Sequence, residues 1–242
     1  MKPRNRKPQA GFSLVELMMV VLVLSIVVGA LFKQINSAQV RYSVEDRRVD
    51  LTQQERDFID QFTRDLHQAG YPSLAQFGGR LDLSSNLTAA GIWKVSQNDL
   101  AMEADVDGDG VVEEISYHYD DGSTWTGAGA NPCPCLRRSS NPKINGTLPW
   151  NQPAPVYFTQ VQNIIPINGQ PFFQAYGANG DSIDISTPTV LSSATPNDPT
   201  YQFLLNIKNL RITFTTQAKG TDTDAHKSIQ VTMTGMARLP NN

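Results

Sequence analysis

The stretch "GFSLVELMMVVLVLSIVVGALF", residues 11–32, decides the fold class of this 242-residue chain. The 21 residues from Phe12 to Phe32 contain a single charged side chain, Glu16. As a helix this run is about 30 Å long, enough to cross the hydrocarbon core of a bilayer. A carboxylate inside such a run costs free energy and usually has a function. The stretch therefore predicts a membrane-spanning helix with one functional carboxylate near its start.

Two ordinary interpretations explain only part of this pattern. The flank before the run is basic, as in a secretory signal peptide, and holds Lys2, Arg4, Arg6 and Lys7. A signal peptide, however, has an apolar stretch of about 7–15 residues before its cleavage site, and this run is longer. A plain membrane anchor with a cytoplasmic amino end fits the length and the basic flank. It does not explain Glu16.

The same residues resemble the type IV prepilin signal, in which a short basic leader ends in glycine and is followed by phenylalanine and a glutamate inside an unbroken apolar helix. Here these residues are Gly11, Phe12 and Glu16. The resemblance implies that a prepilin peptidase cuts after Gly11 and methylates the new amino group of Phe12. Glu16 would then face the amino group of a neighbouring subunit in the filament core, where opposite charges attract more strongly than in water.

Behind the apolar run, the pattern of an amphipathic helix continues. Between Ser37 and Ala69 apolar residues recur at spacings of four and seven: Val40, Val44, Leu51, Phe58, Phe62 and Leu66. Gly70 and Pro72 fit a helix end. The sequence thus predicts one helix from Phe12 to Ala69.

The remainder of the chain is typical of strands and loops. The predicted strands are 92–95, 114–119, 155–164, 201–207, 209–216 and 227–239. Strand after strand behind one long helix predicts an α+β, pilin-like fold with an antiparallel sheet on the helix. The predicted organisation is a leader (1–11), a transmembrane or filament-core helix (12–36), the amphipathic half of the helix (37–71) and a β-rich domain (72–242). Residues 122–155 are rich in Gly and Pro and are expected to be a surface excursion.

An acidic segment predicts a structural Ca²⁺ site. Asp105, Asp107 and Asp109 alternate before Gly110, as in the first half of a calcium loop. The expected remaining ligands are the Val111 carbonyl and Glu113, with Glu114 as a substitute for Glu113. The alternative is a solvated acidic turn before a strand.

The sequence gives little support for catalysis. Cys133 and Cys135 could form a local disulfide, pair between chains or stay free, and they are too few for a zinc site. The histidines, His67, His118 and His226, fall in a helix end, a strand and a polar turn and suggest no common site. No phosphate loop or nucleophile elbow occurs. We therefore expect a protein that is not an enzyme.

Further segments resemble PilW-type minor pilins and the related J-type pseudopilins of type II secretion. They are "FTRDLHQAGYPS" (62–73), "DVDGDGVVEEISYHYD" (105–120) and the closing hairpin from Asn209, whereas residues 122–200 resemble nothing known to us. The resemblance implies a minor pilin of a type IV pilus that acts in filament initiation or at the tip. The alternatives are a type II secretion pseudopilin and a DNA-uptake pilus subunit.

Charge and the resemblance together give the expected partners and location. Without its leader the chain has 16 basic and 23 acidic residues, a formal charge of −7, which does not favour nucleic-acid binding. The run "CLRRSSNPK" (135–143) is the one basic segment that suggests DNA, and it is more typical of a solvated loop. The expected partners are prepilin peptidase, other minor pilins, the major pilin and inner-membrane lipid. The protein would span the inner membrane once, with its domain in the periplasm, and then enter the filament at the cell surface.

Overall fold

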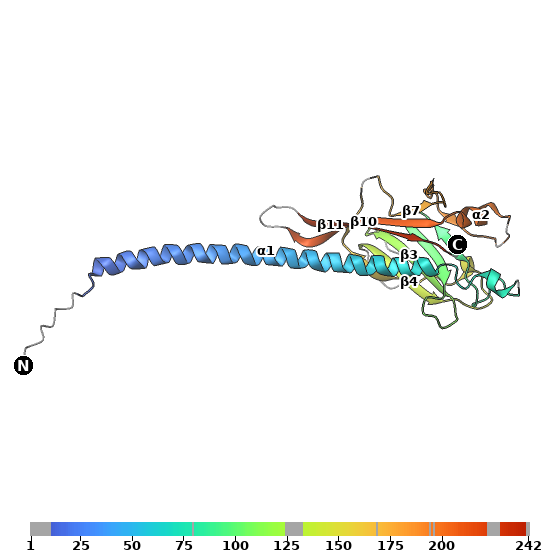
Figure 1. Ribbon diagram of the computed structural model, residues 1–242, viewed down its shortest axis with the longest axis horizontal. Coiled ribbons are helices and arrows are strands. Elements are labelled where there is room, and N and C mark those ends of the chain that lie inside the picture. Colours follow the sequence, from blue (N-terminus) through green and yellow to red (C-terminus); the bar gives the residue numbers. More distant parts are fainter. Residues whose placement is uncertain are drawn as a thin grey trace, which may run out of the picture. The chain divides into compact units, whose positions relative to one another are not determined.

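The computed structural model describes residues 11–78, 80–123, 133–167, 169–193, 195, 197–221 and 228–240. The chain divides into two compact units, Met1–Asp46 and Arg47–Asn242. A long N-terminal helix is followed by antiparallel sheets, so the predicted α+β, pilin-like architecture is confirmed (Figure 1). The predicted leader lies, except for Gly11, outside the described residues.

Helix α1 runs from Leu14 to Gln68, within two residues of the predicted bounds. Gly70 follows in the left-handed region, with φ 78°. Its N–H donates to the carbonyl of Glu103, a strand residue, over 2.9 Å, so the end of the helix is bonded to a sheet. The glycine ends the helix because a side chain would strain this backbone conformation.

The larger sheet has six antiparallel strands in the order β5-β4-β3-β2-β1-β9. Their bounds are β1 Gly91–Val95, β2 Asp99–Ala104, β3 Glu113–Asp121, β4 Pro134–Pro142, β5 Phe158–Gln162 and β9 Thr189–Val190. The smaller sheet has the order β11-β10-β7-β8, and β6 pairs with β10 beside β7. Its bounds are β6 Ile164–Ile165, β7 Phe173–Tyr176, β8 Ser182–Ile183, β10 Asn209–Thr221 and β11 Ser228–Arg238. Three short helices complete the second unit: η1 Leu74–Phe77, η2 Pro149–Asn151 and α2 Pro199–Leu205.

The core of the second unit forms where the last turns of α1 meet both sheets. The ring of Phe58 lies 5.9 Å from Tyr117 of β3 and 5.7 Å from Phe214 of β10, between centroids, and Phe62 lies 6.0 Å from Phe173 of β7. These edge-to-face and stacked contacts lie at distances that aromatic pairs prefer. The last three residues of the predicted apolar stripe, Phe58, Phe62 and Leu66, therefore lie in this core, whereas Val40, Val44 and Leu51 are only partly buried.

The predicted strand at 201–207 is wrong, because Pro199–Leu205 forms helix α2. The side chain of Asp198 accepts hydrogen bonds from the N–H groups of Thr200 and Tyr201, and Pro199 occupies the first turn. Both features are helix-start signals, and here they override the aromatic and branched residues that suggested a strand.

The expected surface excursion at 122–155 is also wrong for residues 134–142. Strand β4 lies inside the larger sheet, between β3 and β5. Its nine residues pair in register with β3, from Asp121 opposite Pro134 to Glu113 opposite Pro142. The prolines lie at the two ends of the strand, where they interrupt little of the ladder. The predicted strand at 155–164 is split at Asn163, whose φ is 56°, between β5 and β6.

Candidate functional site

The N-terminal part of α1 is an apolar surface that the described chain leaves uncovered. Phe12 is 79% exposed, and every large apolar side chain from Leu14 to Phe32 is at least 39% exposed. Monomeric soluble proteins rarely expose a continuous apolar surface of this size. Among the described residues, α1 is the one helix long and apolar enough to cross a membrane. By length and composition this helix could therefore anchor the chain in a membrane.

Glu16 lies in the first turn of this helix. The Leu17 N–H donates to the Ser13 carbonyl over 3.1 Å, so the turn is already formed around Glu16. A carboxylate is favoured here by the helix dipole. In the part of the chain that the structure describes, Glu16 has no ionic partner. Gly11 and Phe12 precede the helix, and no heavy atom lies within 4 Å of where a side chain at Gly11 would begin.

Residues 6–32 match the prokaryotic N-terminal methylation motif. The chain therefore starts with a prepilin-type segment. The match supports a type IV pilin-like protein, a structural and not an enzymatic type, with membrane anchoring through α1 and processing by prepilin peptidase. It covers the N-terminal segment alone. No curated protein and no solved structure matches the chain.

Beyond the prepilin segment, the acidic loop brings three carboxylates together. Oxygens of Asp105, Asp107 and Asp109 lie within 4.8 Å of one another. Each carboxylate also accepts a backbone N–H within the loop, for example Asp105 from Gly108 over 2.7 Å. Both Gly108 and Gly110 have positive φ, which lets the loop turn tightly enough to bring the aspartates together.

Glu113, the expected closing ligand, lies outside this group of three. One of its carboxylate oxygens accepts the Val106 N–H over 2.9 Å. Burial, and then the charges of the three aspartates, raise the pKa of Glu113. The Val111 N–H donates to Asp109, and Glu114 lies on β3 among other buried charges. The three aspartates fit the oxygen ligands that Ca²⁺ prefers, but they already share hydrogen bonds with their own loop. A calcium ion here stays a prediction.

The structure joins Cys133 and Cys135 in a disulfide, with the Cα atoms 5.3 Å apart. A carboxylate oxygen of Asp120 lies within 4.8 Å of both sulfurs. Because the sulfurs are bonded to each other, this group does not offer two thiolates to a metal.

The basic residues of the segment 135–143 are engaged inside the protein, which corrects the expected solvated loop. Arg137 bonds to Asp120 at 2.8 Å, and Arg138 bonds to Asp65 of α1 at 2.8 Å. Lys143 bonds to Glu103 at 2.7 Å, and neither side chain of this pair is exposed. The sequence signal for these pairs is weak: the basic residues lie within 137–143 and their acidic partners lie in α1, β2 and β3, so pairing between distant segments decides which charges meet.

One face of the larger sheet carries a cluster of buried charges. Glu114 of β3 lies directly opposite Glu103 of β2. Burial, and then the charge of Glu103, raise the pKa of Glu114 to about 7. Burial also raises the pKa of Glu103 and lowers that of Lys143, because both charged forms lose water. One Glu103 oxygen, Oε1, is buried without a hydrogen-bond partner.

The histidines do not converge in the described chain. His67 lies in the last turn of α1, and the Nδ1 atom of His118 lies 2.8 Å from an Asp99 oxygen on the neighbouring strand. His226 lies outside the described residues. His118 is thus placed in a half-buried contact with Asp99, where Lys94 also reaches the same carboxylate.

Proposed function

We propose that this protein is a minor pilin of a type IV pilus, acting in filament initiation or at the tip. The observation that supports this most is the methylation motif at the head of a helix whose apolar side chains from Leu14 to Phe32 are exposed. Cleavage after Gly11 would place a methylated amino group on Phe12, four residues before Glu16. The apolar surface would first lie in the inner membrane and then among the helices of the filament. The β-rich unit would supply contacts to other minor pilins and to the major pilin.

Glu16 would select its neighbour by charge. In a bundle of apolar helices a lone carboxylate loses its water without compensation, whereas a carboxylate next to an ammonium group is stabilised. The absence of a partner for Glu16 within the described chain supports a partner from another subunit. The pairing would set the axial register between subunits, because only one offset brings Glu16 to the amino group of Phe12.

Two other assignments use the same helix. A type II secretion pseudopilin would share the processing and the helix packing. A DNA-uptake subunit would need a basic surface, and the basic side chains at 137, 138 and 143 each bond to a carboxylate of this chain. That observation favours the pilus or secretion assignment over DNA binding. Co-purification from intact membranes separates these two, because pilus and secretion subunits are different partners.

Replacing Glu16 tests the proposal. Glu16→Ala should still insert into the membrane, since apolarity drives insertion, and its incorporation into filaments should fall by about tenfold or more, as expected for the loss of a charge pair in a low dielectric. Ser25→Ala is the matched control, because Ser25 is the other polar side chain well inside the apolar run and bonds to the Val21 carbonyl of its own helix. Quantitative blotting of membrane and sheared-filament fractions measures both variants. Incorporation of Glu16→Ala at the wild-type level would contradict the pairing role.

A further inference from the structure

The two sulfurs of the Cys133–Cys135 disulfide differ in their surroundings. Cys135 lies in β4, is 0% exposed and pairs with Asp120 of β3 and Gln162 of β5. Cys133 precedes the strand and is partly exposed. Cys133 therefore offers surface to a reagent from solution, whereas Cys135 offers none.

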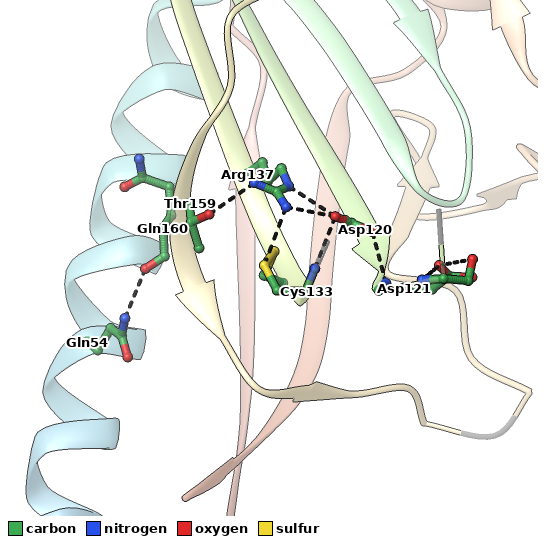
Figure 2. The surroundings of a disulfide bond; sticks show 10 residues. Gln54, Asp120, Asp121, Cys133, Arg137, Thr159 and Gln160 are labelled. Carbon is green, nitrogen blue, oxygen red and sulfur yellow. Dashed lines mark hydrogen bonds and ion pairs between the residues drawn. A yellow bond between two sulfur atoms is a disulfide. The ribbon is translucent and has the colours of Figure 1, made fainter. Parts of the chain in front are cut away.

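A buried arginine points at the more accessible sulfur. The Nη2 atom of Arg137 donates to the Cys133 sulfur over 3.4 Å (Figure 2). The same guanidinium donates to Asp120 over 2.8 and 3.2 Å and to the Thr159 hydroxyl over 3.1 Å. Arg137 is 0% exposed, so these three partners fix its position.

Asp120 completes the surroundings of the disulfide. It accepts from Arg137, Gly122 N–H and Cys133 N–H, and these bonds outweigh burial and lower the pKa of Asp120. Asp120 balances the net charge of Arg137. Arg137 therefore acts on the Cys133 sulfur mainly through its directed N–H group.

The ring that the disulfide closes is too small for the bond to serve mainly to stabilise the fold. A disulfide stabilises chiefly by restricting the unfolded chain, and this effect grows with the length of the closed loop. Cys133 and Cys135 are two residues apart, one directly before β4 and one at its start. The bond joins no separate parts of the domain.

We propose that Cys133 and Cys135 form a thiol–disulfide exchange site, in which Cys133 reacts with outside thiols and disulfides and Cys135 closes the bond. In the oxidising direction the Cys133 thiolate, held by the Arg137 N–H, attacks a disulfide of low molecular mass. One thiolate of that disulfide leaves, and Cys133 carries a mixed disulfide. The Cys135 thiol then loses its proton and attacks the Cys133 sulfur, which releases the second thiolate. The protein dithiol is oxidised by two electrons, and the outside disulfide is reduced to two thiols.

The first test needs no substitution. The full chain in detergent is reduced with excess dithiol under native conditions, treated briefly with iodoacetamide, and mapped by mass spectrometry. We expect Cys133 to be alkylated at least about tenfold faster than Cys135, since thiol reactivity follows exposure and thiolate stabilisation. In denaturant the two rates should be equal. Equal rates in the native protein, a faster Cys135, or no reaction before unfolding would each overturn the assignment.

Single variants test the two roles separately. Cys135→Ser should take up oxidised glutathione as a stable mixed disulfide on Cys133, because no second thiol can release it. Cys133→Ser should take up none until it is unfolded. A Cys133→Ser variant modified at the same rate as Cys135→Ser would contradict the division of roles.

The part played by Arg137, a positioning residue, is tested by a pH profile in the Cys135→Ser background. Arg137→Lys keeps a positive charge next to Asp120 but loses the N–H fork that reaches sulfur. We expect the midpoint of Cys133 alkylation to rise by about one pH unit, as expected for loss of a hydrogen bond to a charged group. Arg138→Lys is the matched control, because Arg138 is the next residue and bonds to Asp65 and not to sulfur. Equal pH profiles for the two variants would show that Arg137 does not stabilise the Cys133 thiolate.

Discussion

At the scale of the residue, Asp65 links α1 to two strands of the larger sheet. Its Oδ2 atom accepts from the Tyr117 hydroxyl over 2.6 Å and from Arg138 Nε over 2.8 Å. Tyr117 is fully buried, and burial followed by the charge of Asp65 raises its pKa well above the ordinary value. Asp65 therefore satisfies one polar group from each of these two strands.

Removing Asp65 should leave the half-buried charge of Arg138 and the buried Tyr117 hydroxyl without this partner. We expect Asp65→Ala to lower the free energy of unfolding of a soluble form starting near residue 37 by about 3 kcal/mol. Asp60→Ala, at an exposed position of the same helix, should change it by less than about 0.5 kcal/mol. Urea denaturation followed by circular dichroism measures both. Equal midpoints for the two variants would show that the link contributes little.

The raised pKa of Glu114 predicts how the stability of the domain depends on pH. Its pKa is about 7 in the folded chain against 4.5 ordinarily, so the folded state binds more protons between these values. The contribution of Glu114 is fully present below pH 4.5 and is lost as the pH rises to about 7. Glu114→Gln should flatten the fall in melting temperature across this window, with part of the slope remaining from Glu103, whose pKa is also raised. Glu45→Gln on the exposed part of α1 is the control, and an unchanged slope in Glu114→Gln would contradict the assignment.

At the scale of the element, local patterns predicted the long helix and some of the strands, and they missed β2, β4, β7, β8 and β9. The apolar run, the stripe behind it and Gly70 gave α1 to within two residues, and β1, β3, β10 and β11 lie where alternation predicted strands. The failures are informative. Asp198 and Pro199 start a helix that the aromatic content of 201–207 concealed, and the prolines of β4 lie at its ends, where a strand tolerates them.

The acidic loop gives a prediction at the same scale. If Asp105, Asp107 and Asp109 bind Ca²⁺ with a Kd of about 0.1–1 mM, as in extracellular modules, calcium at ten times Kd should stabilise the domain by about 1.4 kcal/mol. The measurement is the melting temperature with calcium, with magnesium and with chelator. Asp107→Ala should abolish the calcium effect, and Asp184→Ala, which removes an exposed carboxylate bonded to the Ser186 N–H elsewhere, should not. Identical melting curves with calcium and chelator would leave the loop as a solvated turn.

At the scale of the whole molecule, the sequence could not predict the features that depend on pairing between distant segments of the chain. The prepilin segment is local, and its Gly11, Phe12 and Glu16 can be read without a structure. The division of the strands into two sheets, and the partners of Arg137, Arg138 and Lys143, depend on pairing between segments far apart in the chain, such as Lys94 with Val190. No local pattern distinguishes a buried arginine next to an aspartate from a solvated one, because the burial is supplied by strands elsewhere in the chain.

The central claim is that α1 is a processed prepilin helix, and the chemical state of the amino terminus tests it most directly. Intact-mass measurement and N-terminal sequencing of the protein purified from membranes of a host with an active prepilin peptidase should show a chain that starts with N-methylated Phe12. A chain that still starts at Met1, or one cut after Ala30 so that it starts at Leu31, would contradict the account.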